Sequence, residues 1–283
     1  MLLQAPPRSS PTWSAELPHA HSTHCCVLLA AKQHTAANVS LCLVSPVDPE
    51  AVVLMHSLLG EESDGVWSDT WPSARAAASV LLSQPELVRG CRVVELGSGC
   101  GLAGLAAAAA GCVAITFSDL EPRALFCALA GAVLNGHIVT EGSAFVRGLA
   151  LPRRLEHAPA PAEASARVLD WTTPVPQELR HAFDVAVLCD VLYRAELVLP
   201  LARTCTELLA VPSGRIILTD TSSRRGKDGL RAEFVTALAS HGLHLVTSAR
   251  VVDEAPASVL DSNTGTSTPV EVLHFAFAAA IER

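Results

Sequence analysis

The sequence has few aromatic and few charged residues. Aromatic residues make up 4% of its 283 positions, with a single tyrosine, and charged residues make up 17%. That charged share lies below the quarter that is usual in soluble domains, whereas half of the residues are apolar. A mostly disordered chain is therefore excluded, and the length suits one large α/β domain or two small ones with a sizeable core.

A surplus of basic residues is also missing. Lys and Arg together number 20 against 28 Asp and Glu, which gives a formal net charge of −8. Nucleic acid binding needs cationic side chains against the phosphates, and the sequence contains no basic stripe with interleaved aromatic residues. We therefore expect no nucleic acid partner.

Long apolar runs are absent near the N-terminus. The longest there, residues 25–31 and 52–55, fall far short of the roughly 20 residues that span a bilayer. Residues 1–7 lack the basic-then-apolar order of a signal peptide. No acidic residue precedes Glu16, which leaves an organelle-targeting segment open, although Arg8 is the only base there. We expect no membrane partner.

The nine cysteines are scattered and include no CxxC pair. This pattern predicts reduced thiols and a cytoplasmic location, with the nucleus as the alternative. A crowded group near the N-terminus lacks the paired spacing of a zinc site, so we expect no metal. Its members are His19, His21, His24, Cys25 and Cys26. The Gly-x-Ser-x-Gly turn of α/β-hydrolases is absent.

Composition divides the chain into three parts. Residues 1–24 are rich in Pro, Ser and His without periodicity, which predicts a flexible tail. Residues 25–70 predict an extension of short strands and a turn of helix that packs on the core. Residues 71–283 form the predicted main domain, with an exposed insertion at about 152–166, where Ala-Pro repeats occur.

From residue 91 onward, strand and helix patterns alternate. Strands are expected at 91–96, 113–117, 168–170, 183–189 and 215–220, followed by two closing strands at 244–252 and 270–278. Alternation of this kind predicts a mostly parallel sheet with helices on both faces. The two closing strands have no helix between them and predict an antiparallel hairpin. The expected fold is thus a doubly wound, seven-stranded α/β sheet with a C-terminal hairpin, as in Rossmann-like proteins.

A glycine-rich turn follows the first of these strands. Gly97, Gly99 and Gly101 stand between a buried strand and a helix. Glycine permits a sharp turn and close approach of a ligand to the backbone. The helix start presents unpaired N–H groups, and ligands of open α/β sheets bind at the carboxyl ends of strands. The turn therefore predicts a cofactor site.

Two cofactors fit the spacing of this turn. Residues 99–104 match the GxGxxG pattern of dinucleotide-binding proteins, and Asp119 could accept ribose hydroxyls from either cofactor. Glu95, however, interrupts the apolar strand, and a buried carboxylate needs a partner. The cationic methionine end of S-adenosylmethionine would supply that partner, whereas the pyrophosphate of NAD would be repelled. S-adenosylmethionine is the favoured cofactor.

Several motifs resemble a known family in order and spacing over roughly residues 60–280. They are 95–105, 117–119 and 133–136, together with 71–74, 169–171 and 190–193. The first three resemble the class I, seven-strand methyltransferases that use S-adenosylmethionine. The last three are closer to methyltransferase family 16, the eukaryotic protein-lysine methyltransferases.

The resemblance implies a role for each matching residue. Glu95 and the turn at Gly97, Ser98, Gly99 and Gly101 would hold the methionine part of the cofactor, Asp119 the ribose, and Asp170 with Trp171 the adenine. Trp71 would lie over the cofactor, and Leu120 is a further cofactor-binding residue. Asp190 and Tyr193 would line the acceptor channel as the catalytic residues.

Alternatives remain open for some of these residues. Trp71 could be a core aromatic, Asp170 could cap the following turn, and Tyr193 could serve packing alone. Many relatives carry Asp-Pro and then Arg after the fifth strand; here Asp220 and Arg224 are candidate substitutes, without the Pro.

The expected activity is transfer of a methyl group to a lysine amine of a protein, with a chaperone or translation factor as the partner that the resemblance suggests. The alternatives are a methyltransferase acting on a small molecule or a non-lysine site, and an NAD-dependent oxidoreductase.

Overall fold

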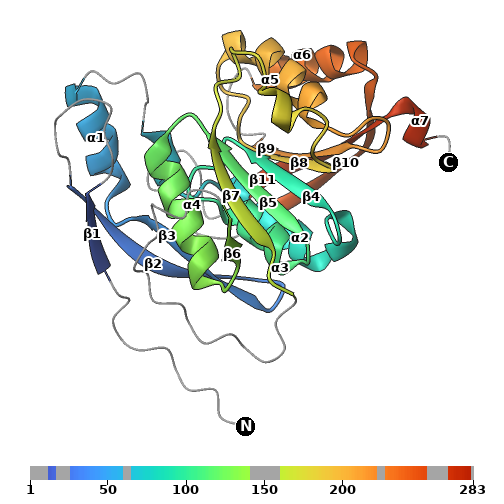
Figure 1. The fold of residues 1–283 in the computed structure, drawn as a ribbon. Helices are drawn as coiled ribbons and strands as arrows, with labels where there is room; N and C mark the ends of the chain where they lie inside the picture. Colours follow the sequence, from blue (N-terminus) through green and yellow to red (C-terminus); the bar gives the residue numbers. More distant parts are fainter. Residues whose placement is uncertain are drawn as a thin grey trace.

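A computed structural model describes residues 12–16, 26–59, 65–140, 160–221, 227–253 and 267–281. Its centre is an eight-stranded sheet with the strand order β10-β11-β9-β8-β4-β5-β7-β6 (Figure 1). The strands are β4 (Arg92–Leu96), β5 (Ala114–Asp119), β6 (Ile138–Val139), β7 (Glu163–Val168), β8 (Val185–Cys189), β9 (Arg215–Thr221), β10 (Leu243–Asp253) and β11 (Thr268–Phe277). Strands β4 to β9 pair in parallel, while β11 is antiparallel to both β9 and β10. The predicted α/β class and C-terminal hairpin are confirmed.

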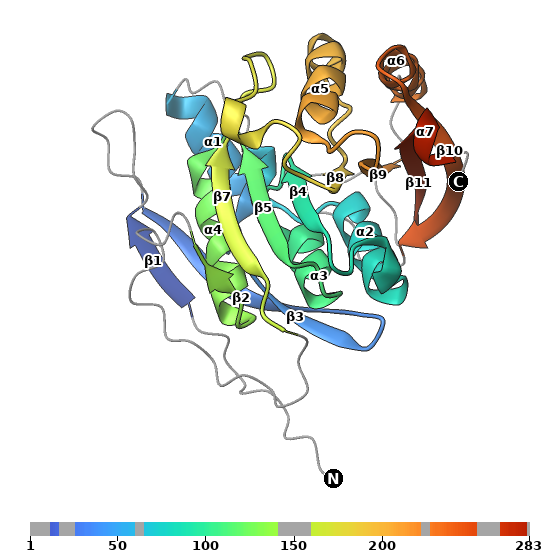
Figure 2. The same ribbon diagram turned by 45° about the vertical axis from the view of Figure 1, so that its right-hand side comes forward.

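Helices cover both faces of this sheet, as Figure 2 shows. One face carries α2 (Pro72–Ser83), α3 (Leu102–Ala109) and α4 (Pro122–Leu134), and the other carries α5 (Ala195–Leu208) and α6 (Lys227–Ser240). Short helices are η1 (Val66–Ser68), η2 (Pro85–Leu87), η3 (Gln177–Leu179) and α7 (Ala278–Ile281). The two-residue period of a strand separates the faces. In β4, for example, Val93 packs into the core around α3, and Val94 and Leu96 pack into the core beneath α5 and α6.

A separate three-stranded antiparallel sheet precedes the main domain. It consists of β1 (Thr12–Glu16), β2 (Cys26–Ala36) and β3 (Val39–Pro46), followed by α1 (Pro49–Leu59). Asn135, at the end of α4, fixes this sheet to the main domain. Its amide accepts from the Cys42 backbone N–H at 2.9 Å and donates to the Cys42 carbonyl at 2.7 Å, as a neighbouring strand would. The extension thus lies on α4, on the outer side of that helix layer (Figures 1 and 2).

The structure differs from the sequence prediction in three places. Residues 12–16, expected within a flexible tail, pair with β2 as strand β1, and the rest of residues 1–24 lies outside the described part. The sheet has eight strands and not seven, because the two-residue strand β6 extends its edge beside β7. Strand β7 occupies Glu163–Val168 and not 168–170, so the end of the expected insertion is a strand. Ala164 and Ala166 lie in this strand, and alanine is a poor signal for β structure.

Among the described residues, no helix combines the length and the apolar character that crossing a membrane requires.

Candidate active site

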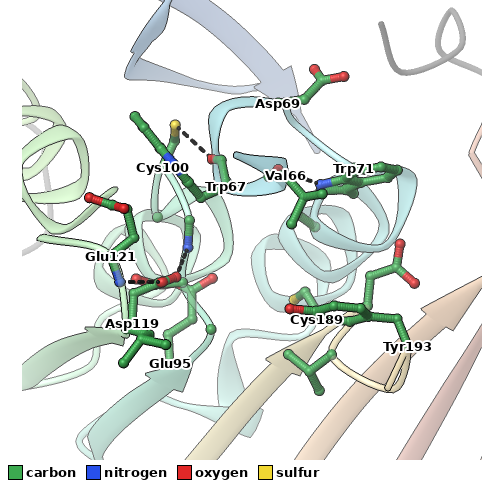
Figure 3. A pocket seen from close by; sticks show the side chains of 18 of the residues that line it. Val66, Trp67, Asp69, Trp71, Glu95, Cys100, Asp119, Glu121, Cys189 and Tyr193 are labelled. Carbon is green, nitrogen blue, oxygen red and sulfur yellow. Dashed lines mark hydrogen bonds between the residues drawn. The ribbon is translucent and has the colours of Figure 1, made fainter. Parts of the chain in front are cut away.

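A single pocket at the carboxyl ends of β4, β5 and β8 brings all of the predicted site residues together. The lining consists of Val66, Trp67, Asp69, Thr70, Trp71, Ala74, Glu95, Gly97, Ser98, Gly99, Cys100, Gly101, Leu102, Asp119, Leu120, Glu121, Leu169, Asp170, Trp171, Cys189, Asp190, Val191, Tyr193, Arg194 and Leu197. Figure 3 shows Glu95 and Asp119 on one side of this pocket, with Trp71, Cys189 and Tyr193 across from them. Trp71 and Tyr193, which are 122 positions apart in sequence, therefore face one space.

The glycine turn forms the floor of the pocket. Gly97, Gly99 and Gly101 all have positive φ angles, of 66°, 49° and 83°, which other residues rarely adopt. A β-carbon at Gly97 would also lie 2.9 Å from the Val191 side chain, so both backbone angle and space require glycine. Ser98, between two of the glycines, donates its backbone N–H to the Ser118 carbonyl at 2.9 Å. This bond links the turn to the end of the neighbouring strand β5.

Glu95 lies buried beneath the turn and faces α3. The strand period places it on the same face as Val93, and its Oε2 accepts the Gly104 backbone N–H at 2.9 Å. Position 104 has no room for a larger residue, because a β-carbon there would lie 2.6 Å from this oxygen. Burial raises the pKa of Glu95 to about 8, against the lowering effect of the backbone N–H bonds. Without a cationic ligand, the carboxyl is therefore largely protonated at neutral pH.

Asp119, at the end of β5, is tied to the turn by both carboxylate oxygens. Oδ2 accepts the Gly99 N–H at 2.8 Å and Oδ1 accepts the Glu121 N–H at 3.0 Å. Burial raises its pKa to about 6. In the described part of the chain, neither Asp119 nor Glu95 forms an ion pair with a basic side chain. Both carboxyl groups thus have backbone partners and remaining lone pairs toward the pocket.

The wall opposite the turn comes from η1 and the start of α2. The Trp71 indole donates to the Val66 carbonyl at 3.0 Å, which orients its ring beside the pocket. Trp67 was not among the predicted site residues. Its backbone carbonyl accepts a hydrogen bond from the Cys100 thiol at 3.4 Å, and its indole N–H donates to the His56 ring at 3.2 Å. The wall is thereby joined to the glycine turn. Trp71 is half-buried and lines the pocket, which differs from the alternative of a core aromatic.

The predicted adenine side contains Asp170 and Trp171. Oδ1 of Asp170 accepts the Thr172 backbone N–H at 2.8 Å and its hydroxyl at 2.7 Å, so Asp170 caps the following turn and also lines the pocket. Leu120, a further predicted cofactor residue, is 55% exposed and offers apolar surface at the pocket. The Trp171 ring lies close to the position of a β-carbon on Gly97, at 3.4 Å. Apolar surface from both side chains suits a flat aromatic ligand.

The predicted acceptor side contains Asp190 and Tyr193, in the loop after β8. Asp190 has a positive φ of 60° and is buried, and its backbone N–H donates to the Thr219 carbonyl at 2.9 Å. Its Oδ1 accepts the Thr221 hydroxyl at 3.2 Å and is also bonded to the Lys227 ammonium. Tyr193 is 42% exposed at the pocket, which is unlike a side chain that serves core packing alone.

Asp220, a candidate for replacing a family position after the fifth strand, lies behind Asp190 and is fully buried. It accepts from Lys227 at 2.6 Å and from Arg231 at 2.8 Å. Arg224, the other candidate, lies outside the described residues, as do His19, His21, His24 and Cys25. Lys227 was not predicted as a site residue, because nothing in the sequence distinguishes a buried lysine at a helix start from a solvated one.

Acidic side chains outnumber basic ones in the lining of the pocket. They are Asp69, Glu95, Asp119, Glu121, Asp170 and Asp190 against the one base Arg194. The Arg123 guanidinium donates to both carboxylate oxygens of Glu121, at 2.6 Å and 2.7 Å, and balances its charge. The carboxyl groups of Glu95 and Asp119 accept from backbone N–H groups only. The Ser98 hydroxyl and the Trp171 indole N–H line the pocket, buried and without a hydrogen-bond partner among the described residues.

These features fit S-adenosylmethionine. Its ammonium and sulfonium are cations, its ribose offers hydroxyls to Asp119, and its adenine is flat. The pyrophosphate of NAD would instead meet Asp119, which repels it, and Glu95, which offers it no positive charge. Among the described residues, no group of His, Cys, Asp and Glu is arranged to hold a metal ion.

Comparisons with known proteins agree with this geometry. Residues 55–146 match the model of the lysine methyltransferase family. The chain is 33% identical over 177 residues to calmodulin-lysine N-methyltransferase of Arabidopsis thaliana, covering 62% of this chain and 51% of that protein. It is 39% identical over 74 residues to the electron transfer flavoprotein beta subunit lysine methyltransferase of Rattus norvegicus, covering 26% and 29%. The matches thus span about half of the plant relative and less of the rat protein.

The fold is shared with a solved structure from Streptococcus mutans, of a protein proposed to be a SAM-dependent methyltransferase. The TM-score is 0.51 at 14% identity, covering 87% of this chain and 55% of that one. This likeness concerns the fold alone. Residues 55–146 therefore resemble the lysine methyltransferase family, and the similarity to the plant relative agrees with that likeness.

Proposed function

We propose that this protein transfers a methyl group from S-adenosylmethionine to a lysine amine of a protein substrate. The observation that carries the proposal is the pocket, in which Glu95 and Asp119 lack a basic partner beside a glycine turn. A cationic ligand supplies the positive charge that these carboxyl groups lack. The family match and the two lysine-methylating relatives support the same reaction.

The chain's own residues then have separate tasks. Glu95 and Ser98 hold the methionine end, Asp119 orients the ribose, and Leu120 with Trp171 encloses the adenine. When bound, the cofactor supplies a methyl group on a positively charged sulfur. Alignment and exclusion of water are the main contributions left to the protein.

The acceptor side has to present a neutral amine, because an ammonium has no lone pair for attack. Lysine has an ordinary pKa of about 10.4, so a site that operates near neutral pH must favour loss of the proton. The nitrogen then forms a bond to the methyl carbon while the carbon–sulfur bond breaks, and the proton leaves to solvent. Asp190 orients the amine and Tyr193 forms part of the channel wall.

A first experiment compares ligands by thermal shift. S-adenosylhomocysteine should raise the melting temperature and NAD should not, because only a ligand that binds the folded state stabilises it. Stabilisation by NAD alone would overturn the proposal in favour of an oxidoreductase.

A second experiment identifies the acceptor. The purified protein is incubated with labelled S-adenosylmethionine and a cell lysate, and label on a protein band is assigned to a residue by mass spectrometry. Label on lysine supports the proposal, whereas label only on small molecules or on another residue type favours the alternative methyltransferase. The Asp190→Asn variant should lose transfer while it still binds S-adenosylhomocysteine; transfer at the normal rate would contradict the role of Asp190.

The substrate protein is not inferred from the relatives, whose names point to two different proteins, calmodulin and the electron transfer flavoprotein beta subunit. A chaperone or translation factor remains our proposal for the partner, and the labelled band in the lysate tests it. A cytoplasmic location, with the nucleus as the alternative, is likewise a proposal that imaging of the tagged protein tests.

A further inference from the structure

A buried network of charges lies directly behind the acceptor side of the pocket. The ammonium of Lys227 is bonded to Asp190, lies 2.6 Å from Oδ1 of Asp220 and lies 3.4 Å from the hydroxyl of Thr221. Arg231 contacts the other oxygen of Asp220 at 2.8 Å. The side chains of Lys227 and Asp220 are 3% and 0% exposed. We call these residues (Asp190, Asp220, Lys227 and Arg231) the β9–α6 network.

The strand period explains why these groups meet. On β9, Ile216 and Leu218 pack beneath α5 and α6, so Asp220 faces the same side. Lys227 begins α6 and Arg231 follows four residues later, on the same face of the helix. The network contains two carboxylates and two cations, so its charges balance without solvent.

Only one member of the β9–α6 network reaches the pocket. Asp190 lines it, and Lys227 is absent from the lining, so the ammonium approaches Asp190 from the side away from the pocket. The acceptor amine would therefore meet a carboxylate that is already paired with a cation.

Pairing of this kind matters for the protonation of the acceptor. An unpaired carboxylate beside a lysine raises the pKa of that lysine and holds its proton. Such a carboxylate would bind the substrate ammonium well and yet slow its reaction. A carboxylate already paired with Lys227 orients the amine by hydrogen bonding. It raises the pKa of the acceptor lysine much less than an unpaired carboxylate does.

We propose that Lys227 is a positioning residue of the acceptor site, which fixes Asp190 and cancels its charge so that the acceptor lysine can react as a neutral amine. This inference rests on the proposed function. Lys227 acts through Asp190 and touches neither substrate nor cofactor. The other ionisable groups facing the β9–α6 network are Glu95 and Cys189 toward the pocket, Arg194 in the loop, Asp228 on α6, and the Glu271–Arg250 pair on the hairpin.

The test compares Lys227→Gln with Lys227→Arg and Arg231→Gln. For each protein, kcat is measured between pH 6 and 10 at saturating cofactor and substrate. In Lys227→Gln, the rise of kcat with pH should move upward by about one unit, which is about a tenfold loss near pH 7.5 and recovery at high pH. Lys227→Arg keeps the charge and should restore the wild-type profile. Arg231→Gln removes a cation that contacts Asp220 but not Asp190, and should lower stability without moving the profile.

Two measurements without methyl transfer accompany these profiles. Calorimetric affinity for S-adenosylhomocysteine should be the same in Lys227→Gln as in the wild type, because Lys227 lies away from the cofactor side. Nitrogen-15 NMR of the wild type should show one lysine ammonium that exchanges slowly with water and disappears in Lys227→Arg. The NMR measurement decides the case even where Lys227→Gln fails to fold, since a rapidly exchanging ammonium would overturn the proposal.

The outcomes separate the two proposals. A wild-type protein that transfers no methyl group to lysine contradicts the proposed function. A wild type that does transfer it, with an unchanged pH profile in Lys227→Gln or an equal shift in Arg231→Gln, contradicts the positioning role of Lys227 alone.

Discussion

The carboxyl groups at the two ends of the pocket have different hydrogen-bond partners. At the glycine turn, Glu95 and Asp119 are held by backbone N–H groups and have no basic side chain beside them in the described chain. At the loop after β8, Asp190 and Asp220 are paired with Lys227 and Arg231. Both pairs stand at the carboxyl ends of neighbouring strands of one sheet.

Under the proposed function, the difference corresponds to the charge of what each end would receive. A cofactor with a permanent positive charge is favoured by carboxyl groups that lack a cation. An acceptor that must react as a neutral amine is favoured by a carboxylate that already has one. Variants at the two ends should therefore affect different properties.

Asp220→Asn should lower the free energy of unfolding by about 3–5 kcal/mol, because it leaves buried cations without their partner. The affinity for S-adenosylhomocysteine should change little, since Asp220 is not part of the pocket lining. Chemical denaturation and calorimetric titration measure the two quantities. A variant with normal stability and weakened cofactor binding would reverse the comparison.

Glu95→Gln should change how stability depends on pH in the absence of ligand. The folded-state pKa is raised from 4.5 to about 8, so the neutral form stabilises the fold. The stability that this protonation contributes is fully present below pH 4.5 and is lost as the pH rises through 8. The free energy of unfolding should fall by up to about 1.4 kcal/mol for each pH unit in this range.

The glutamine variant has no proton to lose at this position. Its stability relative to the wild type should therefore increase between pH 5 and pH 9, as measured by denaturation at both values. Glu95→Gln should also bind S-adenosylmethionine more weakly. Equal differences in stability at the two pH values would show that burial does not raise the pKa of Glu95.

Gly104→Ala should lower the free energy of unfolding by about 1–3 kcal/mol through overpacking. The new β-carbon would lie 2.5 Å from the Phe117 ring and 2.6 Å from Oε2 of Glu95, so the carboxyl group must leave its N–H partner. Cofactor binding should weaken with it. Gly229→Ala is the matched control, because Gly229 also lies in a helix but has open space around it, and it should not destabilise.

Asp119→Asn should weaken binding of S-adenosylhomocysteine by about tenfold, because a hydrogen bond to a charged group contributes about 1.5–3 kcal/mol. Stability should also fall, by about 1–3 kcal/mol, since the amide oxygen can accept only one of the Gly99 and Glu121 N–H groups and the amide nitrogen then faces the other. Isothermal calorimetry gives the affinity. An unchanged dissociation constant would remove Asp119 from the cofactor site.

The strand and helix periods were sufficient to predict most of the large sheet and the grouping of the site. Residues that follow successive parallel strands meet at one edge, which is why Glu95, Asp119 and Asp190 could be predicted to share a pocket. Strand β7 was misplaced because Ala164 and Ala166 within it give no clear β signal. Strand β6 is too short to leave a pattern.

The partners of the site residues were harder to predict than the residues themselves. Glu95 was expected to depend on a ligand cation, and the structure adds the backbone N–H of Gly104, which is available only because α3 packs against β4. Lys227 could not be found from sequence, because its pairing with Asp190 depends on where α6 meets β9. Contacts between separate elements are set by packing, and a single sequence shows only the periods within each element.

The position of β11 has a consequence for the order in which the chain is made. This strand follows α6 and β10 in sequence, yet lies between β9 and β10 in the sheet. During synthesis, the hydrogen-bonding edge of β9 beside Asp220 stays unpaired until residues 268–277 have left the ribosome. An unpaired strand edge can join other chains. The nascent protein is therefore most exposed to aggregation just before its last strand inserts, and a premature stop in residues 254–267 would leave that edge open permanently.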